Sequence, residues 1–130
     1  MDELMGKWRK KREFMNIEEY REFCLSLGEV EEKLPFAKIP GGDSVLVFYV
    51  CGHTFCYCDL NDFSSVSLKC QPERIAELRE SSDAFIDPDH LSPKYWIGVI
   101  VNQVPSVLLK ELTLNSFEIV RKKYSKNILK

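Results

Sequence analysis

Residues 45–70 have the sequence VLVFYVCGHTFCYCDLNDFSSVSLKC, and this stretch decides the fold. β-Branched and aromatic residues, which favour strands, fill Val45–Cys51, Thr54–Leu60 and Val66–Cys70. Gly52-His53 lies between the first two of these runs, and a two-residue loop that begins with glycine predicts a type II′ hairpin turn. Three consecutive strands with short connections predict an antiparallel meander.

A helix is expected before the meander. Asn16 and Glu19 have the spacing of a capping box, and apolar residues recur at helical period from Ile17 to Leu27. Gly28 then ends the helix. The other side of this helix, and the segment that follows it to residue 32, are rich in glutamate.

Two more helices and a fourth strand are expected after the meander. Pro72 opens a helix that continues to about Ser81, because proline is accepted in a first helical turn. Tyr95–Val101 has the composition of a strand, and Ser106 caps a long final helix through Tyr124. The expected order is α-β-β-β-α-β-α. It predicts an α+β fold, a two-layer sandwich with an antiparallel sheet and the helices on one face.

The composition fits one globular domain, since 130 residues suffice for a hydrophobic core without disulfides. Residues 15–130 are expected to form this domain. Residues 1–14 form an N-terminal extension whose pattern fits a short amphipathic helix, docked on its own domain or on a second copy. No apolar stretch approaches the roughly 20 residues that span a bilayer, and the N-terminus lacks the pattern of a secretory signal. The sequence predicts a cytoplasmic protein without a membrane partner, a monomer or weak homodimer, with five reduced cysteines.

The hairpin contains four side chains of zinc-ligand type within eight residues: Cys51, His53, Cys56 and Cys58. The expected register pairs Cys51 with Thr54, Tyr49 with Cys56, and Val47 with Cys58. The three cysteines would then share a face, but Cys58 would lie roughly 13 Å along the ladder from Cys51. Zinc ligands must all lie about 2.0–2.3 Å from the metal, so neither a metal site nor a cofactor is expected.

Catalytic motifs are also missing from the sequence. Neither His53 nor His90 has a nucleophile partner in a recognisable motif, and the chain has no Gly-x-Ser-x-Gly and no glycine-rich phosphate loop. His90 lies beside Asp87 and Asp89, a pattern more typical of a solvated turn than of a catalytic pair. The chain is therefore not expected to be an enzyme.

Charge is distributed unevenly around a net charge of −2. Residues 16–89 carry six basic and fifteen acidic side chains, whereas residues 90–130 carry seven basic and two acidic ones. Such a split marks either two functional faces or the preference of cations for helix C-termini. The acidic segment 16–32 fits either a site for hard cations or the solvated side of an amphipathic helix.

A basic and aromatic group follows the third expected strand. It lies at the end of that strand, on the next helix and at the start of the fourth strand: Lys69, Arg74, Arg79, Lys94, Tyr95 and Trp96. Basic side chains bind phosphates, and aromatic side chains stack on nucleobases. This group fits a nucleic-acid contact, although a tryptophan at the start of a strand fits a core position equally well.

Several segments, taken in order, resemble the MmcQ/YjbR family. They are Met15–Leu27 (MNIEEYREFCLSL), Leu34-Pro35-Phe36, Val45–Phe48 (VLVF), Leu68–Arg74 (LKCQPER) with Glu77–Glu80 (ELRE), and Lys94-Tyr95-Trp96. The resemblance covers about residues 15–124 and implies a CyaY-like, or frataxin-like, α+β fold. It also implies a DNA-binding protein in which hairpins flank a basic surface as a double wing.

The resemblance carries functional roles to seven residues: Lys69, Arg74, Arg79, His90, Lys94, Tyr95 and Trp96. Tyr95 stands where the family has histidine, which removes a titratable donor. The resulting hypothesis is a non-enzymatic DNA-binding or regulatory domain that contacts double-stranded DNA. The alternative is a protein-interaction or metal-handling module that uses the acidic first helix, as a frataxin-like fold suggests.

Overall fold

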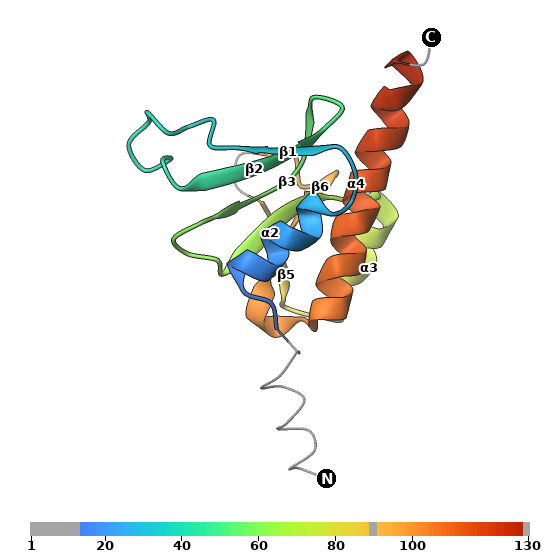
Figure 1. Cartoon of the computed structure of the whole chain (residues 1–130). Coiled ribbons are helices and arrows are strands. Elements are labelled where there is room, and N and C mark those ends of the chain that lie inside the picture. The colour runs from blue at the N-terminus through green and yellow to red at the C-terminus, as the bar shows by residue number, and fades with distance from the viewer. Residues whose placement is uncertain (1–13, 89–90, 129–130) are drawn as a thin grey trace.

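Six antiparallel strands form one sheet in the computed structural model, which describes residues 14–88 and 91–128 (Figure 1). The strand order is β1-β2-β3-β4-β6-β5, so the predicted meander forms the middle of the sheet. The strands are β1 (Val30–Lys33), β2 (Val45–Val50), β3 (His53–Asp59), β4 (Ser65–Lys69), β5 (Phe85–Ile86) and β6 (Trp96–Ile100).

Three helices cover one face of the sheet (Figure 1): α2 (Ile17–Leu25), α3 (Pro72–Ser81) and α4 (Ser106–Ile128). This two-layer α+β arrangement confirms the predicted fold class. The capping box is also confirmed, since the Asn16 side chain accepts from the Glu19 N–H at 2.8 Å and Glu19 accepts from the Asn16 N–H at 3.1 Å. A short 3-10 turn (Val101–Gln103) precedes α4, and no described helix is long and apolar enough to cross a membrane.

The sequence does not predict β1 and β5, the two edge strands. The segment Val30–Lys33 pairs antiparallel with β2 instead of continuing the acidic run as irregular chain. Side chains alternate between the two faces along this strand, so Glu32 points toward Arg21 of α2. The Arg21 Nε donates to the Glu32 carboxylate at 2.9 Å. Charged side chains are common on edge strands, which explains why this strand lacks an apolar signature. Strand β5 has only two residues, too few for any periodicity.

The predicted hairpin turn is wrong by one residue. The turn consists of Cys51 and Gly52, with φ angles of 54° and 78°, and His53 already pairs with Val50. Two consecutive positive φ angles are the mark of a type I′ turn, not of the expected type II′.

A β-bulge follows this turn and changes the predicted register. Phe48 pairs with Cys56 and Tyr49 pairs with Thr54, so Phe55 is an extra residue on β3. Cys58 therefore lies opposite Leu46, not opposite Val47 as predicted. Phe55 itself is fully buried, and its ring meets those of Phe48 and Phe117 at centroid distances of 6.4 and 5.5 Å, the first tilted and the second edge to face.

The core lies between the sheet and the helices. Tyr20 of α2 is fully buried, and its hydroxyl lies 2.8 Å from the Thr113 hydroxyl of α4. Thr113 donates its own proton to the Leu109 carbonyl at 2.8 Å, and the Tyr20 hydroxyl also lies within donating distance of the Cys56 Sγ, at 3.5 Å. These buried polar groups are thus paired, as burial requires. The helix predicted for residues 1–14 lies outside the described residues, except for Phe14.

Candidate nucleic-acid interface

Lys69 and Trp96 lie opposite each other in the sheet, at the end of β4 and the start of β6. Their neighbours Leu68 and Ile97 are fully buried in the core, and successive side chains of a strand point to opposite faces. Lys69 and Trp96 therefore project from the face that the helices leave uncovered. The Lys69 Nζ lies 5.8 Å from the centre of the Trp96 ring, within the range of a cation–π interaction.

Lys94 and Tyr95 lie next to this pair, in a turn that backbone hydrogen bonds hold. The N–H groups of Tyr95 and Trp96 both donate to the Ser92 carbonyl, at 3.2 and 3.0 Å. Lys94 and Tyr95 are exposed, and the Lys94 Nζ lies 5.5 Å from the centre of the Tyr95 ring. The structure thus brings together four of the predicted residues, which we call the lysine–aromatic surface: Lys69, Lys94, Tyr95 and Trp96.

The two predicted arginines lie on α3 and are paired with carboxylates. Arg74 Nη1 donates to the Glu111 Oε2 of α4 at 2.8 Å, and this hydrogen bond lowers the pKa of Glu111. Arg79 forms an ion pair with Asp87. Each arginine would have to exchange its carboxylate for a phosphate in order to bind DNA. The remaining predicted residue, His90, lies outside the described residues.

Sequence reasoning misses a second lysine–aromatic pair on the same face. Phe48 is fully buried in the core, so its neighbour Tyr49 projects from the uncovered face. The Lys33 Nζ of β1 lies 5.4 Å from the centre of the Tyr49 ring. The alternation of β2 could have placed Tyr49 on that face, but Lys33 joins it only through a strand that the sequence does not predict.

The cysteine-rich hairpin turns its thiols into the core. Cys56 is fully buried, and its Sγ lies 3.9 Å from the Cys24 Sγ of α2. Burial, and after it the neighbouring Cys24 thiol, raises the pKa of Cys58 to about 12. The Cys58 thiol is therefore protonated and unreactive at neutral pH. The His53 ring stacks on Tyr124 of α4 at a centroid distance of 3.4 Å, with the ring planes 9° apart.

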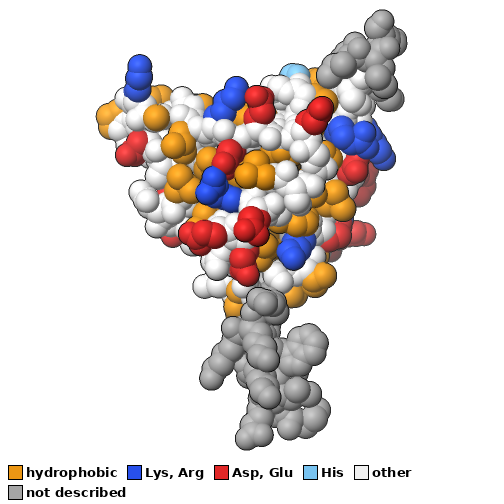
Figure 2. All heavy atoms as spheres, in the orientation of Figure 1, with side chains coloured by type: hydrophobic (Ala, Val, Ile, Leu, Met, Phe, Trp, Pro, Cys, Tyr) orange, Lys and Arg blue, Asp and Glu red, His pale blue; other side chains and the backbone are white. Residues whose placement is uncertain are grey.

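The helical face offers no concentrated charge. Acidic and basic side chains lie interspersed on it (Figure 2). The acidic helix α2 is tied to β1 by the Arg21–Glu32 ion pair. Among the residues that the structure describes, no three side chains of ligand type come close enough together to hold a metal ion.

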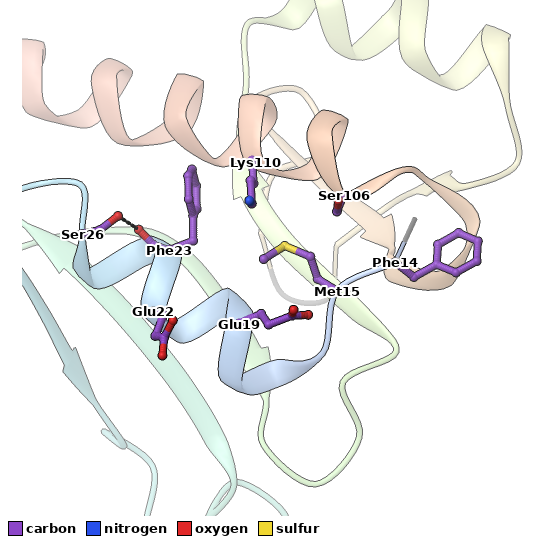
Figure 3. Close-up of a pocket in the computed structure, with 8 residues that line it drawn as sticks. All are labelled: Phe14, Met15, Glu19, Glu22, Phe23, Ser26, Ser106 and Lys110. Carbon is purple, nitrogen blue, oxygen red and sulfur yellow. Dashed lines mark hydrogen bonds between the residues drawn. The ribbon is translucent and has the colours of Figure 1, made fainter. Parts of the chain in front are cut away.

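A hollow of about 350 Å³ lies between α2 and the start of α4 (Figure 3). Its walls combine apolar, acidic and hydroxyl side chains with one lysine: Phe14, Met15, Glu19, Glu22, Phe23, Ser26, Ser106 and Lys110. The Lys110 Nζ lies 5.8 Å from the centre of the Phe23 ring.

Three comparisons place the chain among known proteins. The sequence model of the YjbR family matches residues 25–119. The crystal structure of the Deinococcus radiodurans protein DR2400, whose domain is described as DUF419, has 31% sequence identity and a TM-score of 0.75, and the match covers 85% of this chain and 81% of that one. A crystal structure from Pseudomonas syringae has 20% identity and a TM-score of 0.68 over 82% of this chain and 100% of that chain, which shows a shared fold. No curated protein matches the chain.

Proposed function

The chain belongs to the YjbR family, and from this premise we propose that it is a non-enzymatic DNA-binding domain. The lysine–aromatic surface is the proposed contact with the phosphate backbone. The observation that carries the proposal is the meeting of Lys69 and Trp96 on the face that the helices leave uncovered, with Lys94 and Tyr95 in the turn just before Trp96.

The two lysines differ from the two arginines in one respect that matters for binding. Neither Lys69 nor Lys94 has a carboxylate partner among the described residues, whereas Arg74 and Arg79 each have one. A lysine without a partner can bind a phosphate without first breaking an ion pair. Lys69 and Lys94 are therefore proposed as the phosphate ligands.

The net charge of −2 limits how strong this binding can be. Few phosphate contacts release few counterions, so the expected affinity lies in the micromolar range and falls as salt rises. For two lysines the logarithm of the binding constant should fall with the logarithm of the salt concentration with a slope of about −1.8 on a duplex, or about −1.4 on a single strand.

Fluorescence anisotropy with a labelled oligonucleotide of about 20 nucleotides tests the proposal between about 50 and 200 mM KCl. The oligonucleotide is used both as a single strand and as a duplex. Lys69→Ala should weaken binding and reduce the salt slope by about 0.7 to 0.9. The matched control is Lys122→Ala, which removes an exposed lysine from the C-terminal part of α4 and should leave the slope unchanged.

Two results would contradict the proposal. One is failure of both oligonucleotide forms to bind at the lowest salt concentration. The other is an equal effect of Lys69→Ala and Lys122→Ala, which would mean that the protein attracts DNA through its overall charge and not through this surface.

A further inference from the structure

The uncovered face of the sheet is a continuous surface across all six strands. Paired residues of antiparallel strands share a face, so one row runs through Lys33, Val47, Tyr57, Ser67, Gly98 and Ile86. All three described helices pack on the other face (Figure 1). We call this surface the open face; it also contains Tyr49, Lys69 and Trp96.

Tyr57 stands in the middle of this row, between Val47 and Ser67. Val47 and Ser67 are only 4% and 8% exposed. Gly98 has no side chain, and a Cβ there would lie 2.9 Å from the Cγ1 of Ile86, so the Ile86 side chain lies against Gly98.

Two lysine–aromatic pairs stand on the open face. Tyr49 with Lys33 stands on β2 and β1, and Trp96 with Lys69 stands on β6 and β4. Strands β2 and β6 are three steps apart in the sheet, so the two rings are separated by about 14 Å at the usual strand spacing. The open face thus presents two partly exposed aromatic rings, each next to an ammonium group.

This arrangement suits a single-stranded nucleic acid better than a duplex. The bases of a duplex are stacked on each other and cannot stack on a flat protein surface, whereas unpaired bases can stack on aromatic side chains. At about 3.4 Å per nucleotide of one strand, a separation of about 14 Å is bridged by about four nucleotides. The lysines beside the rings lie where the phosphates that link these bases would pass.

We propose that the open face binds single-stranded nucleic acid, with unpaired bases stacked on Tyr49 and Trp96 and with phosphates bound by Lys33 and Lys69. The inference rests on the proposed function, because it extends the lysine–aromatic surface across the sheet and names the form of nucleic acid. The Glu31 carboxylate would repel a bound phosphate, because Glu31 pairs with Tyr49 and lies on the same face of the sheet. Replacing Glu31 with glutamine is therefore expected to strengthen binding.

Tryptophan fluorescence tests stacking directly. The chain has two tryptophans, Trp8 and Trp96, so the Trp8→Phe protein reports on Trp96 alone. Titration with a thymidine oligonucleotide of about ten residues, which cannot pair with itself, should quench Trp96 emission. A hairpin duplex of similar charge should quench it at least about tenfold less effectively at the same concentration.

Tyr49 gives an independent test at the other end of the open face. Tyr49→Ala should weaken binding of the thymidine oligonucleotide about 5- to 150-fold, the range found for loss of one stacked base, whereas Tyr49→Phe should retain it. Tyr124→Ala is the matched control, because Tyr124 stacks on His53 away from the open face. Urea unfolding of each variant shows whether its fold is retained. If Tyr49→Ala proves unfolded, the Tyr49→Phe protein and the Trp96 titration still test the inference, because both use conservative substitutions.

The outcomes separate this inference from the proposed function. If the duplex binds and Lys69→Ala weakens it, but thymidine neither binds nor quenches Trp96, the inference is overturned and the proposed function stands. If thymidine binds equally to Tyr49→Ala and Tyr49→Phe, stacking across the open face is also refuted. If neither nucleic acid binds, both fail.

Discussion

Replacing Ser116 with alanine is expected to destabilise the fold far more than the loss of one oxygen atom suggests. Ser116 lies on the buried side of α4, with no exposure to solvent. Its Oγ donates to the Phe55 carbonyl at 2.5 Å and accepts from the Lys69 N–H at 2.9 Å. These backbone groups belong to neighbouring strands, but the pairing of β3 with β4 begins only at Cys56, next to the bulge at Phe55. One hydroxyl therefore replaces the hydrogen bonds that the bulge removes.

The size of this destabilisation follows from the two backbone groups that lose their hydrogen-bond partner in the alanine variant. The buried Phe55 carbonyl and the partly buried Lys69 N–H would both lose their partner, and each such group costs about 1 to 3 kcal/mol. The expected loss is therefore about 2 to 6 kcal/mol. Since small domains are stable by only about 5 to 15 kcal/mol, Ser116→Ala should remove a large share of the total.

Urea unfolding followed by far-UV circular dichroism measures this loss. The matched control is Ser81→Ala, which removes a serine hydroxyl that donates to the Leu78 carbonyl at 2.7 Å on the exposed surface of α3. The control should cost less than about 0.5 kcal/mol, as surface substitutions usually do. A loss below about 1 kcal/mol for Ser116→Ala would show that water or a shifted strand satisfies the two groups, and would refute the reasoning.

Three further predictions concern a thiol, the turn and an arginine. Burial, and after it the Cys24 thiol, raises the pKa of Cys58 to about 12 from an ordinary 9.0, so the unfolded thiol ionises first; the contribution of Cys58 to stability should be complete below about pH 9 and should fall by about 1.4 kcal/mol by pH 10. Cys58→Ala should remove this part of the pH dependence in urea unfolding, whereas Cys56 and Cys70, whose pKa values burial also raises, should keep the rest; an unchanged pH dependence would contradict the prediction. Cys51→Asn should raise the free energy of unfolding by up to about 1 kcal/mol, because Asn-Gly is the preferred pair of a type I′ turn and the first residue has a φ of 54°; a lower midpoint of thermal unfolding would contradict it. Arg74→Gln should let the pKa of Glu111 rise toward its ordinary 4.5 in a ¹³C NMR titration, since the lost hydrogen bond is the main cause that lowers it, and an unchanged pKa would disprove this assignment.

Local signals in the sequence were enough to predict the helices and the central strands. The capping box of Asn16 and Glu19 involves residues three apart, and Pro72 marks a helix start by its own geometry. The edge strands could not be predicted in this way. A two-residue strand and a charged strand form only because a neighbouring strand is already in place, and that information is not local.

The candidate interface was predictable in part for the same reason. Lys69 and Trp96 belong to motifs that also carry the family resemblance, and the pairing of β4 with β6 brings them together. The partner of Arg74 is Glu111, 37 residues further along the chain. The sequence near Arg74 therefore cannot show that this arginine is already paired with a carboxylate. Lys33 was missed because its contact with Tyr49 depends on the unpredicted strand β1.

The single extra residue Phe55 links the fold to the proposed function. In the register predicted without a bulge, Cys56 would lie opposite Tyr49, so the thiols and this tyrosine would share one face. The bulge places Cys56 opposite Phe48 instead, which turns Cys56 into the core and leaves Tyr49 on the open face. Since a shift of one residue moves side chains to the other face of a sheet, the bulge decides which side chains are available to a ligand. Ser116 holds the bulge and the Lys69 backbone together, so its loss is expected to loosen the open face as well as the core.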